Sequence, residues 1–158
     1  MKAATLNELK NELKILPQQK LLELCVHLAK YKKENKELLT YLIFESDDEG
    51  TYVNGVKEMI DEKFTEVNRY NLYQAKKSLR KILRETNKYI KYSGKKQTEV
   101  ELLLYYCVKF KGSGINYRSS IALTSIYERQ LIKIGKSISQ LHEDLQYDFK
   151  EELRPLLD

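Results

Sequence analysis

Apolar residues recur at intervals of three and four positions along most of this chain, which is the spacing of one face of an α-helix. The pattern is interrupted at Pro17, at the charged stretch 30–37, at the acidic loop 46–50, and at 93–94 and 111–114. Between these interruptions we expect helices over 5–16, 18–31, 36–44, 51–70, 72–93, 98–111 and from 117 to about 145, with a last turn at 148–153. No segment shows the alternation typical of a β-strand.

Residues at the ends of three of these helices support the assignment. Thr5 with Glu8, and Thr98 with Glu101, match the capping-box pattern, in which each side chain accepts a hydrogen bond from a free backbone N–H at the start of a helix. Gly94 suits the left-handed residue that follows many helices. We therefore expect helices to begin next to Thr5 and Thr98 and one to end before Gly94.

The apolar positions also predict which helix faces are buried. The first helix has the stripe Leu6, Leu9, Leu13 and Leu16, and the second has Leu21, Leu24, Cys25 and Leu28. The segment 98–111 is apolar almost all round, which is typical of a helix at the centre of a domain. The segment 117–145 is long for one globular helix, and we expect a bend near Gly135.

Composition agrees with this assignment. The chain has 158 residues with only six glycines and two prolines, which favours long helices and few turns. That length is typical of one domain, and such a chain buries about 68–70% of its unfolded surface. We expect an all-α fold over residues 1–158, a single helical domain of six to seven helices in antiparallel pairs, arranged as a bundle or a short helical solenoid.

Cysteine content and the apolar runs indicate a location. Cys25 and Cys107 each lie in an apolar helical stripe, so we expect two buried, reduced thiols. The first fourteen residues are charged and lack the apolar core of a signal peptide. The longest uncharged apolar run, 102–108, is too short to cross a bilayer, which needs about 20 residues. We expect a cytoplasmic protein without a transmembrane segment.

Positive charge is concentrated in the segment 72–96. It carries nine cations and one acid, Glu85, whereas the rest of the chain carries 19 cations and 22 acids. On a helical wheel, seven of these cations lie opposite the apolar stripe. We call them the cationic row: Lys76, Lys77, Arg80, Lys81, Arg84, Lys88 and Lys91. Like charges four residues apart on a helix cost roughly 0.2–0.5 kcal/mol per pair, which a nearby acidic surface would offset.

Several interpretations of the cationic row are open. The leading one is a non-enzymatic interaction or scaffold protein that presents this row to an acidic protein surface or to its own second copy. The alternative is weak, sequence-independent nucleic-acid binding, with Tyr73, Tyr89 and Tyr92 available to stack on bases. An anionic membrane surface would also suit the row. The cations would have no outside ligand if they were solvated or paired within the fold.

No complete catalytic, metal or nucleotide-binding motif is present, and we expect neither an enzyme nor a cofactor. His27 follows Cys25 by two positions, so the two side chains point about 200° apart on a helix and cannot act as a dyad. His142 lacks a second histidine at the spacing of zinc proteases. The two helices expected at 72–93 and 98–111, with the turn between them, resemble a helix-turn-helix in outline. The second helix is too apolar to lie in a DNA groove.

The segment 9–44, LKNELKILPQQKLLELCVHLAKYKKENKELLTYLIF, combines a short leucine-spaced helix, a break, a leucine-rich helix, a Lys/Asn/Glu turn and a Leu-Tyr-Leu stretch. In these features it resembles the start of small all-helical bacterial proteins of uncharacterised function. The resemblance covers about a quarter of the chain and implies a helical fold. It carries no catalytic or binding residues.

Overall fold

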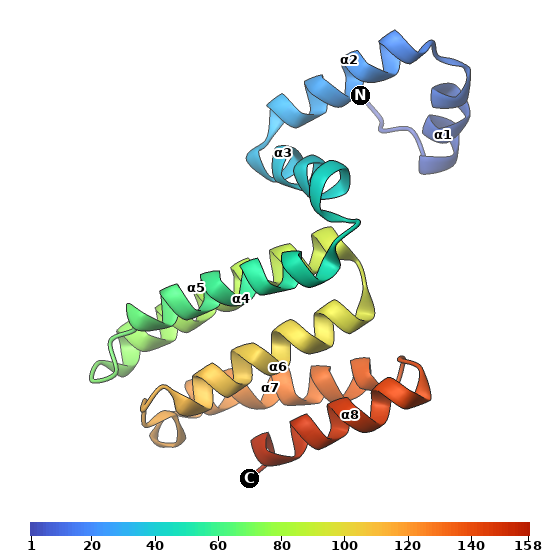
Figure 1. Ribbon diagram of the computed structural model, residues 1–158. Coiled ribbons are helices and arrows are strands. Elements are labelled where there is room, and N and C mark those ends of the chain that lie inside the picture. The colour runs from blue at the N-terminus through green and yellow to red at the C-terminus, as the bar shows by residue number, and fades with distance from the viewer. The chain divides into compact units, whose positions relative to one another are not determined.

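The computed structural model describes residues 1–158, which form α-helices joined by short turns and contain no β-strand (Figure 1). The expected all-α class is confirmed. Eight α-helices are present instead of the six or seven expected: α1 (Leu6–Ile15), α2 (Gln18–Tyr31), α3 (Lys33–Thr40), α4 (Glu49–Thr65), α5 (Leu72–Ser93), α6 (Lys96–Gly112), α7 (Ile121–Ile138) and α8 (Glu143–Leu153). A π-helical turn, η1 (Tyr41–Glu45), and two 3₁₀ turns, η2 (Tyr117–Ser119) and η3 (Arg154–Leu156), complete the order. None of the helices has the length and apolar character needed to span a membrane.

The chain divides into two compact units, unit 1 (Met1–Phe44) and unit 2 (Glu45–Asp158). Every buried hydrophobic residue except Tyr41 belongs to unit 2. The hydrophobic core of the protein is therefore formed by α4 to α8 and their connections. The single domain expected from the chain length stays a prediction.

Unit 1 has the helices expected from the sequence but not the expected burial. Thr5 and Glu8 form the predicted capping box, and α2 has the predicted bounds. Neither α1 nor α2 contains a buried residue, and the Leu6 side chain is 86% exposed. Within this unit α2 packs against α3, whereas α1 makes no comparable contact. The residues of the two stripes are half-buried or exposed, because an amphipathic helix buries its apolar face only where other elements cover it.

Unit 2 is organised around α6, as predicted from its apolar composition. This helix contacts α4, α5, α7 and α8. Its buried side chains cover most of its circumference and comprise Thr98, Val100, Leu102, Leu103, Leu104, Tyr106, Cys107 and Phe110. The Phe110 ring of α6 contacts the rings of Tyr117 and Tyr127, and these two contact each other, at centroid distances of 5.2–5.4 Å. Figure 1 shows the helices of unit 2 following one another in chain order.

The predicted start of α6 is wrong. The helix begins at Lys96, two residues early, and its N-cap has no side-chain hydrogen bond. Thr98 is 2% exposed and its hydroxyl donates to Glu49 Oε1 at the start of α4, at 2.5 Å. Glu101 pairs with Lys57 of α4, also at 2.5 Å. Both side chains of the expected capping box are therefore engaged in contacts with α4, which outweigh a local cap.

The predicted helix from 117 to 145 is two helices, which accounts for the higher helix count. Ser120 caps the start of α7 by accepting a hydrogen bond from the Leu123 N–H. The break falls at 139–142 and not near Gly135, which lies inside α7. His142 then caps α8, where its ring nitrogen Nδ1 accepts from the Asp144 N–H at 3.4 Å. The His142 side chain thus accepts a hydrogen bond from one of the free backbone N–H groups at the start of α8.

Candidate interaction surface on helix α5

The sequence of α5 fixes which of its faces is buried. Asn71 caps the helix by accepting a hydrogen bond from the Gln74 N–H at 3.0 Å. Gly94 ends it in the left-handed conformation, with φ of 66°, as predicted. The buried side chains are Ala75, Leu79, Ile82, Thr86 and Ile90, all on one stripe. The cationic row occupies the remaining surface of the helix, because its members lie between about a quarter and half a turn away from the centre of this stripe.

Most of the cationic row is exposed to solvent. Five of its members are exposed and two are half-buried: the former are Lys77, Arg80, Lys81, Arg84 and Lys91, and the latter are Lys76 and Lys88. From Lys76 to Lys91 the row extends over fifteen helical steps, or about 22 Å at 1.5 Å per residue. Seven cations over that length give roughly one charge every 3 Å along the helix.

Six of the seven cations have no carboxylate partner within the chain: Lys76, Lys77, Arg80, Lys81, Arg84 and Lys91. The one acid in the segment, Glu85, points to α4 and pairs with Lys63 at 3.2 Å. Other cations of unit 2 are paired across helices, as Lys109 is with Asp61 at 2.8 Å and Lys133 with Glu99 at 3.0 Å. Internal pairing therefore does not neutralise the row.

Tyrosines border the row at both ends. Tyr73 is 61% exposed, and the ammonium groups of Lys76 and Lys77 lie 5.4 and 4.5 Å from the centroid of its ring. Near the other end, the Lys88 ammonium lies 4.7 Å from the ring centroid of Tyr89, which is half-buried. Cations above aromatic faces are held by the negative charge density of the ring. Of the three tyrosines on α5, Tyr73 alone is exposed, whereas Tyr89 and Tyr92 are half-buried.

A second group of charges fixes the turn between α5 and α6. The Glu49 carboxylate accepts hydrogen bonds from Ser93 and from Thr98, and Lys95 pairs with it at 2.8 Å. Glu99 pairs with Lys96 at 2.6 Å. Burial opposes ionisation of Glu99, but the ammonium groups of Lys96 and Lys133 outweigh it and lower its pKa. Lys95 and Lys96 therefore stabilise the fold, which separates them from the cationic row.

Of the two thiols, one is buried and the other is exposed. Cys107 is fully buried, and burial raises the pKa of its thiol to about 12. The prediction of a second buried thiol is wrong, because Cys25 is exposed on α2. His142 serves as the cap of α8 and lies 3.3 Å from Asp144. No three histidine, cysteine or acidic side chains gather in a way that would hold a metal ion.

The sequence predicted the positions of the cationic row. It gave no indication of a hollow that residues of α4, α6 and α8 line together, because these helices are distant from one another in the sequence. Comparison with known proteins adds no family: no protein-family model, curated protein or solved structure matches this chain. The resemblance of segment 9–44 to small helical bacterial proteins stays a prediction.

Proposed function

We propose that this protein is a non-enzymatic interaction protein that presents the cationic row of α5 to an acidic partner, either an acidic protein surface or a second copy of the chain. The observation that carries the proposal is the exposed row itself, in which six cations lack a carboxylate partner although unit 2 pairs cations elsewhere. Repulsion along such a row weakens the helix, and an acidic ligand removes that cost.

The packing of unit 2 supports a scaffold role. The helices α4, α6 and α8 contact one another in series, as α5 and α7 also do. We infer a short solenoid of antiparallel helix pairs, in which α5 belongs to one outer layer and its polar face is left for a ligand. The rigid attachment of α5 through Glu49, described above, keeps the row in one orientation. A preorganised row loses less conformational entropy when it binds.

A second copy of the chain is a specific version of the acidic partner. Five acidic side chains lie exposed on α8, namely Glu143, Asp144, Asp148, Glu151 and Glu152. Within α8 and η3 they are opposed by two cations, Lys150 and Arg154. The row of one molecule and the acidic helix of another are complementary in charge. A contact of this kind joins different surfaces of the two molecules and is therefore head-to-tail.

Nucleic-acid binding is the second candidate, and the exposed Tyr73 ring favours it. An aromatic ring beside several cations is the usual combination for holding single-stranded nucleic acid, because bases stack on the ring while phosphates meet the cations. The burial of α6 excludes the docking used by a helix-turn-helix, in which that helix would lie in the major groove. This candidate therefore predicts binding without sequence preference.

Charge reversal tests both candidates. The variant Arg80→Glu/Arg84→Glu changes two exposed cations four residues apart. Lys10→Glu/Lys14→Glu makes the same change of net charge at the same spacing on α1 and serves as the matched control. Binding of a fluorescent oligoglutamate and of a mixed-sequence single-stranded DNA is measured by anisotropy at about 50 and 500 mM salt.

The proposal predicts that the oligoglutamate binds wild type at low salt and is released at high salt. Two lost attractions and two new repulsions, each about 0.5 kcal/mol, weaken binding by about 2 kcal/mol, or about thirty-fold. The control variant should change affinity by less than about threefold. Equal binding by both variants would refute the proposal, and tight binding of DNA without oligoglutamate binding would favour the second candidate. Sedimentation of wild type and the Arg80/Arg84 variant tests the second-copy version: a monomer in both excludes it.

A further inference from the structure

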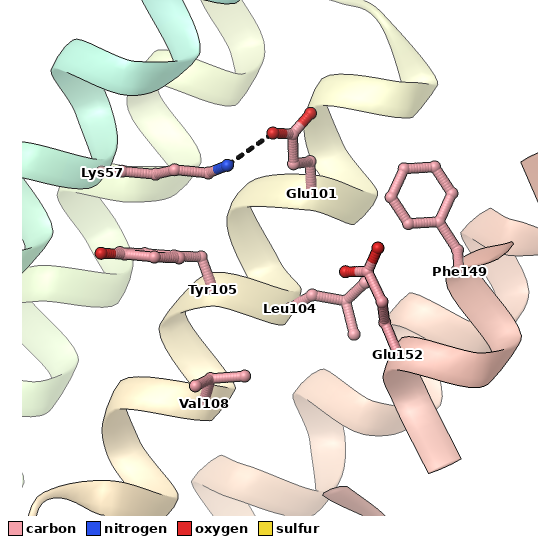
Figure 2. A pocket seen from close by; sticks show the side chains of 7 residues that line it. All are labelled: Lys57, Glu101, Leu104, Tyr105, Val108, Phe149 and Glu152. Atoms are coloured by element: carbon pink, nitrogen blue, oxygen red, sulfur yellow. Dashed lines mark hydrogen bonds and ion pairs between the residues drawn. The ribbon is translucent and has the colours of Figure 1, made fainter. Parts of the chain in front are cut away.

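Two hollows lie along the exposed edge of α6, each with a volume of about 460 Å³. The first is bounded by α4, α6 and α8, and Figure 2 shows Lys57 on one side with Phe149 and Glu152 of α8 on the other. The second is bounded by the C-terminal parts of α4 and α6 and by the loop after α4. Both are lined by Val108, and we call the two neighbouring hollows together the α6 groove. It does not involve α5.

The charges on the floor of the α6 groove are paired with one another. Lys57 and Glu101 form an ion pair at 2.5 Å, and Lys109 and Asp61 form another at 2.8 Å. Between them the Tyr105 hydroxyl donates to Asp61 Oδ2 at 2.7 Å, and both ammonium groups lie within 5.5 Å of the Tyr105 ring centroid. Because each ammonium group on the floor is paired with a carboxylate, the floor does not need a charged ligand to neutralise it.

Val108 is the apolar centre of the groove. It is 49% exposed although it belongs to the most buried helix of the protein, and the preceding residue, Cys107, is fully buried. An exposed valine between two hollows offers apolar contact area that folding has not covered. Burying such a side chain stabilises a complex by about 25 cal/mol for each Å² removed from water.

The rims of the groove carry one charge of each sign that is not paired within the chain. Glu152 lies on the α8 rim of the first hollow, and Arg69 lies beyond α4 in the second. Along α6 the residues that line the two hollows run from Glu101 to Gly112, which is eleven positions or about 16 Å. An extended chain covers that length in about five residues. The two rim charges therefore match an extended peptide that carries a basic residue toward one end and an acidic residue toward the other.

We propose that the α6 groove binds a short extended peptide segment of a partner protein, with a basic residue against Glu152, an apolar residue on Val108 and an acidic residue against Arg69. Charge complementarity at the two rims sets the direction of the peptide, and the exposed valine supplies the apolar contact. The site is separate from the cationic row, because the two surfaces share no residue. Its failure in a test would leave the proposed function of α5 unaffected.

The test uses a random peptide library displayed on phage, selected against the full-length chain. The expected result is enrichment of peptides that carry an apolar residue between a basic and an acidic residue. Selected peptides should bind Val108→Glu at least about tenfold more weakly, because that change places a charge at the apolar centre. Arg80→Glu/Arg84→Glu, which alters only α5, should bind them as wild type does. Circular dichroism checks that each variant is folded.

Charge reversal on the rim makes the result specific. Selection against Glu152→Lys should return peptides with an acidic residue in place of the basic one, because the rim charge has changed sign. Glu152 is exposed and has no ion pair in the chain, so this variant keeps the fold. The inference is overturned if no peptide is enriched, if selected peptides bind Val108→Glu as tightly as wild type, or if Glu152→Lys selects the same charge pattern as wild type.

Discussion

The central position of α6 predicts a large and position-dependent loss of stability when its side chains are shortened. Leu103 is fully buried in unit 2. Shortening a fully buried leucine to alanine costs about 2.7–5 kcal/mol, because apolar contact is lost and a cavity remains. Val108, five residues further along the same helix, is 49% exposed. Leu103→Ala and Val108→Ala therefore compare a buried and an exposed position within one helix.

The expected shift in melting temperature follows from the size of unit 2. Unfolding entropy is about 2.1 cal/mol/K per residue, or roughly 0.24 kcal/mol/K for a unit the size of residues 45–158. A loss of about 3 kcal/mol then lowers the melting temperature by about 12 °C. Val108→Ala should lower it by no more than about 3 °C, because half of that side chain is already in water. Thermal unfolding followed by far-UV circular dichroism measures both.

The comparison would refute the described packing if the two variants melted at similar temperatures. It would do so equally if Leu103→Ala melted within a few degrees of wild type. Either result would mean that α6 is not enclosed by α4, α5, α7 and α8. Part of the apolar surface of this helix would then face water.

Three further outcomes test particular contacts. Gly94→Ala should destabilise by about 1–2 kcal/mol, because φ is 66° there, whereas Gly135→Ala inside α7 should stabilise by about 0.5–1 kcal/mol; chemical denaturation measures both. Burial opposes ionisation of Asp61, but its ion pair with Lys109 and the hydrogen bond from Tyr105 lower its pKa overall. The stability that the ionised carboxylate contributes is therefore present at neutral pH and is lost as pH falls below about 4. The stability difference between wild type and Asp61→Asn should therefore shrink on acidification, and a difference that grew instead would contradict this. A thiol reagent at neutral pH should modify the exposed Cys25 and leave Cys107 unmodified until the chain is denatured; reaction of both thiols in the native protein would contradict the burial of Cys107.

Local signals in the sequence predicted much of the secondary structure. The proline at position 17 and the glycine at 94 mark ends that the structure confirms, and the Thr5–Glu8 capping box is formed. The same capping pattern at Thr98 failed, because Glu49 of α4 accepts a hydrogen bond from that hydroxyl. Local pattern alone cannot show when a distant acceptor competes for the capping side chain.

Burial and pairing needed the three-dimensional structure. An apolar stripe such as that of α1 shows which face would be buried, but not whether a second helix covers it. A helical wheel placed the cationic row correctly, but whether acids such as Glu85 neutralise it depended on which helix they point to. The α6 groove left no signal, because Val108 is one apolar residue among many in the segment 98–111.

The measurement that tests the central claim most directly is a map of backbone amide shifts. The isotope-labelled full-length chain is titrated with an oligoglutamate at low salt, and the spectra are followed residue by residue. The account predicts shifts concentrated on α5 between Tyr73 and Tyr92, and their loss in Arg80→Glu/Arg84→Glu. Shifts spread evenly over the exposed lysines of both units, or none on α5, would contradict it.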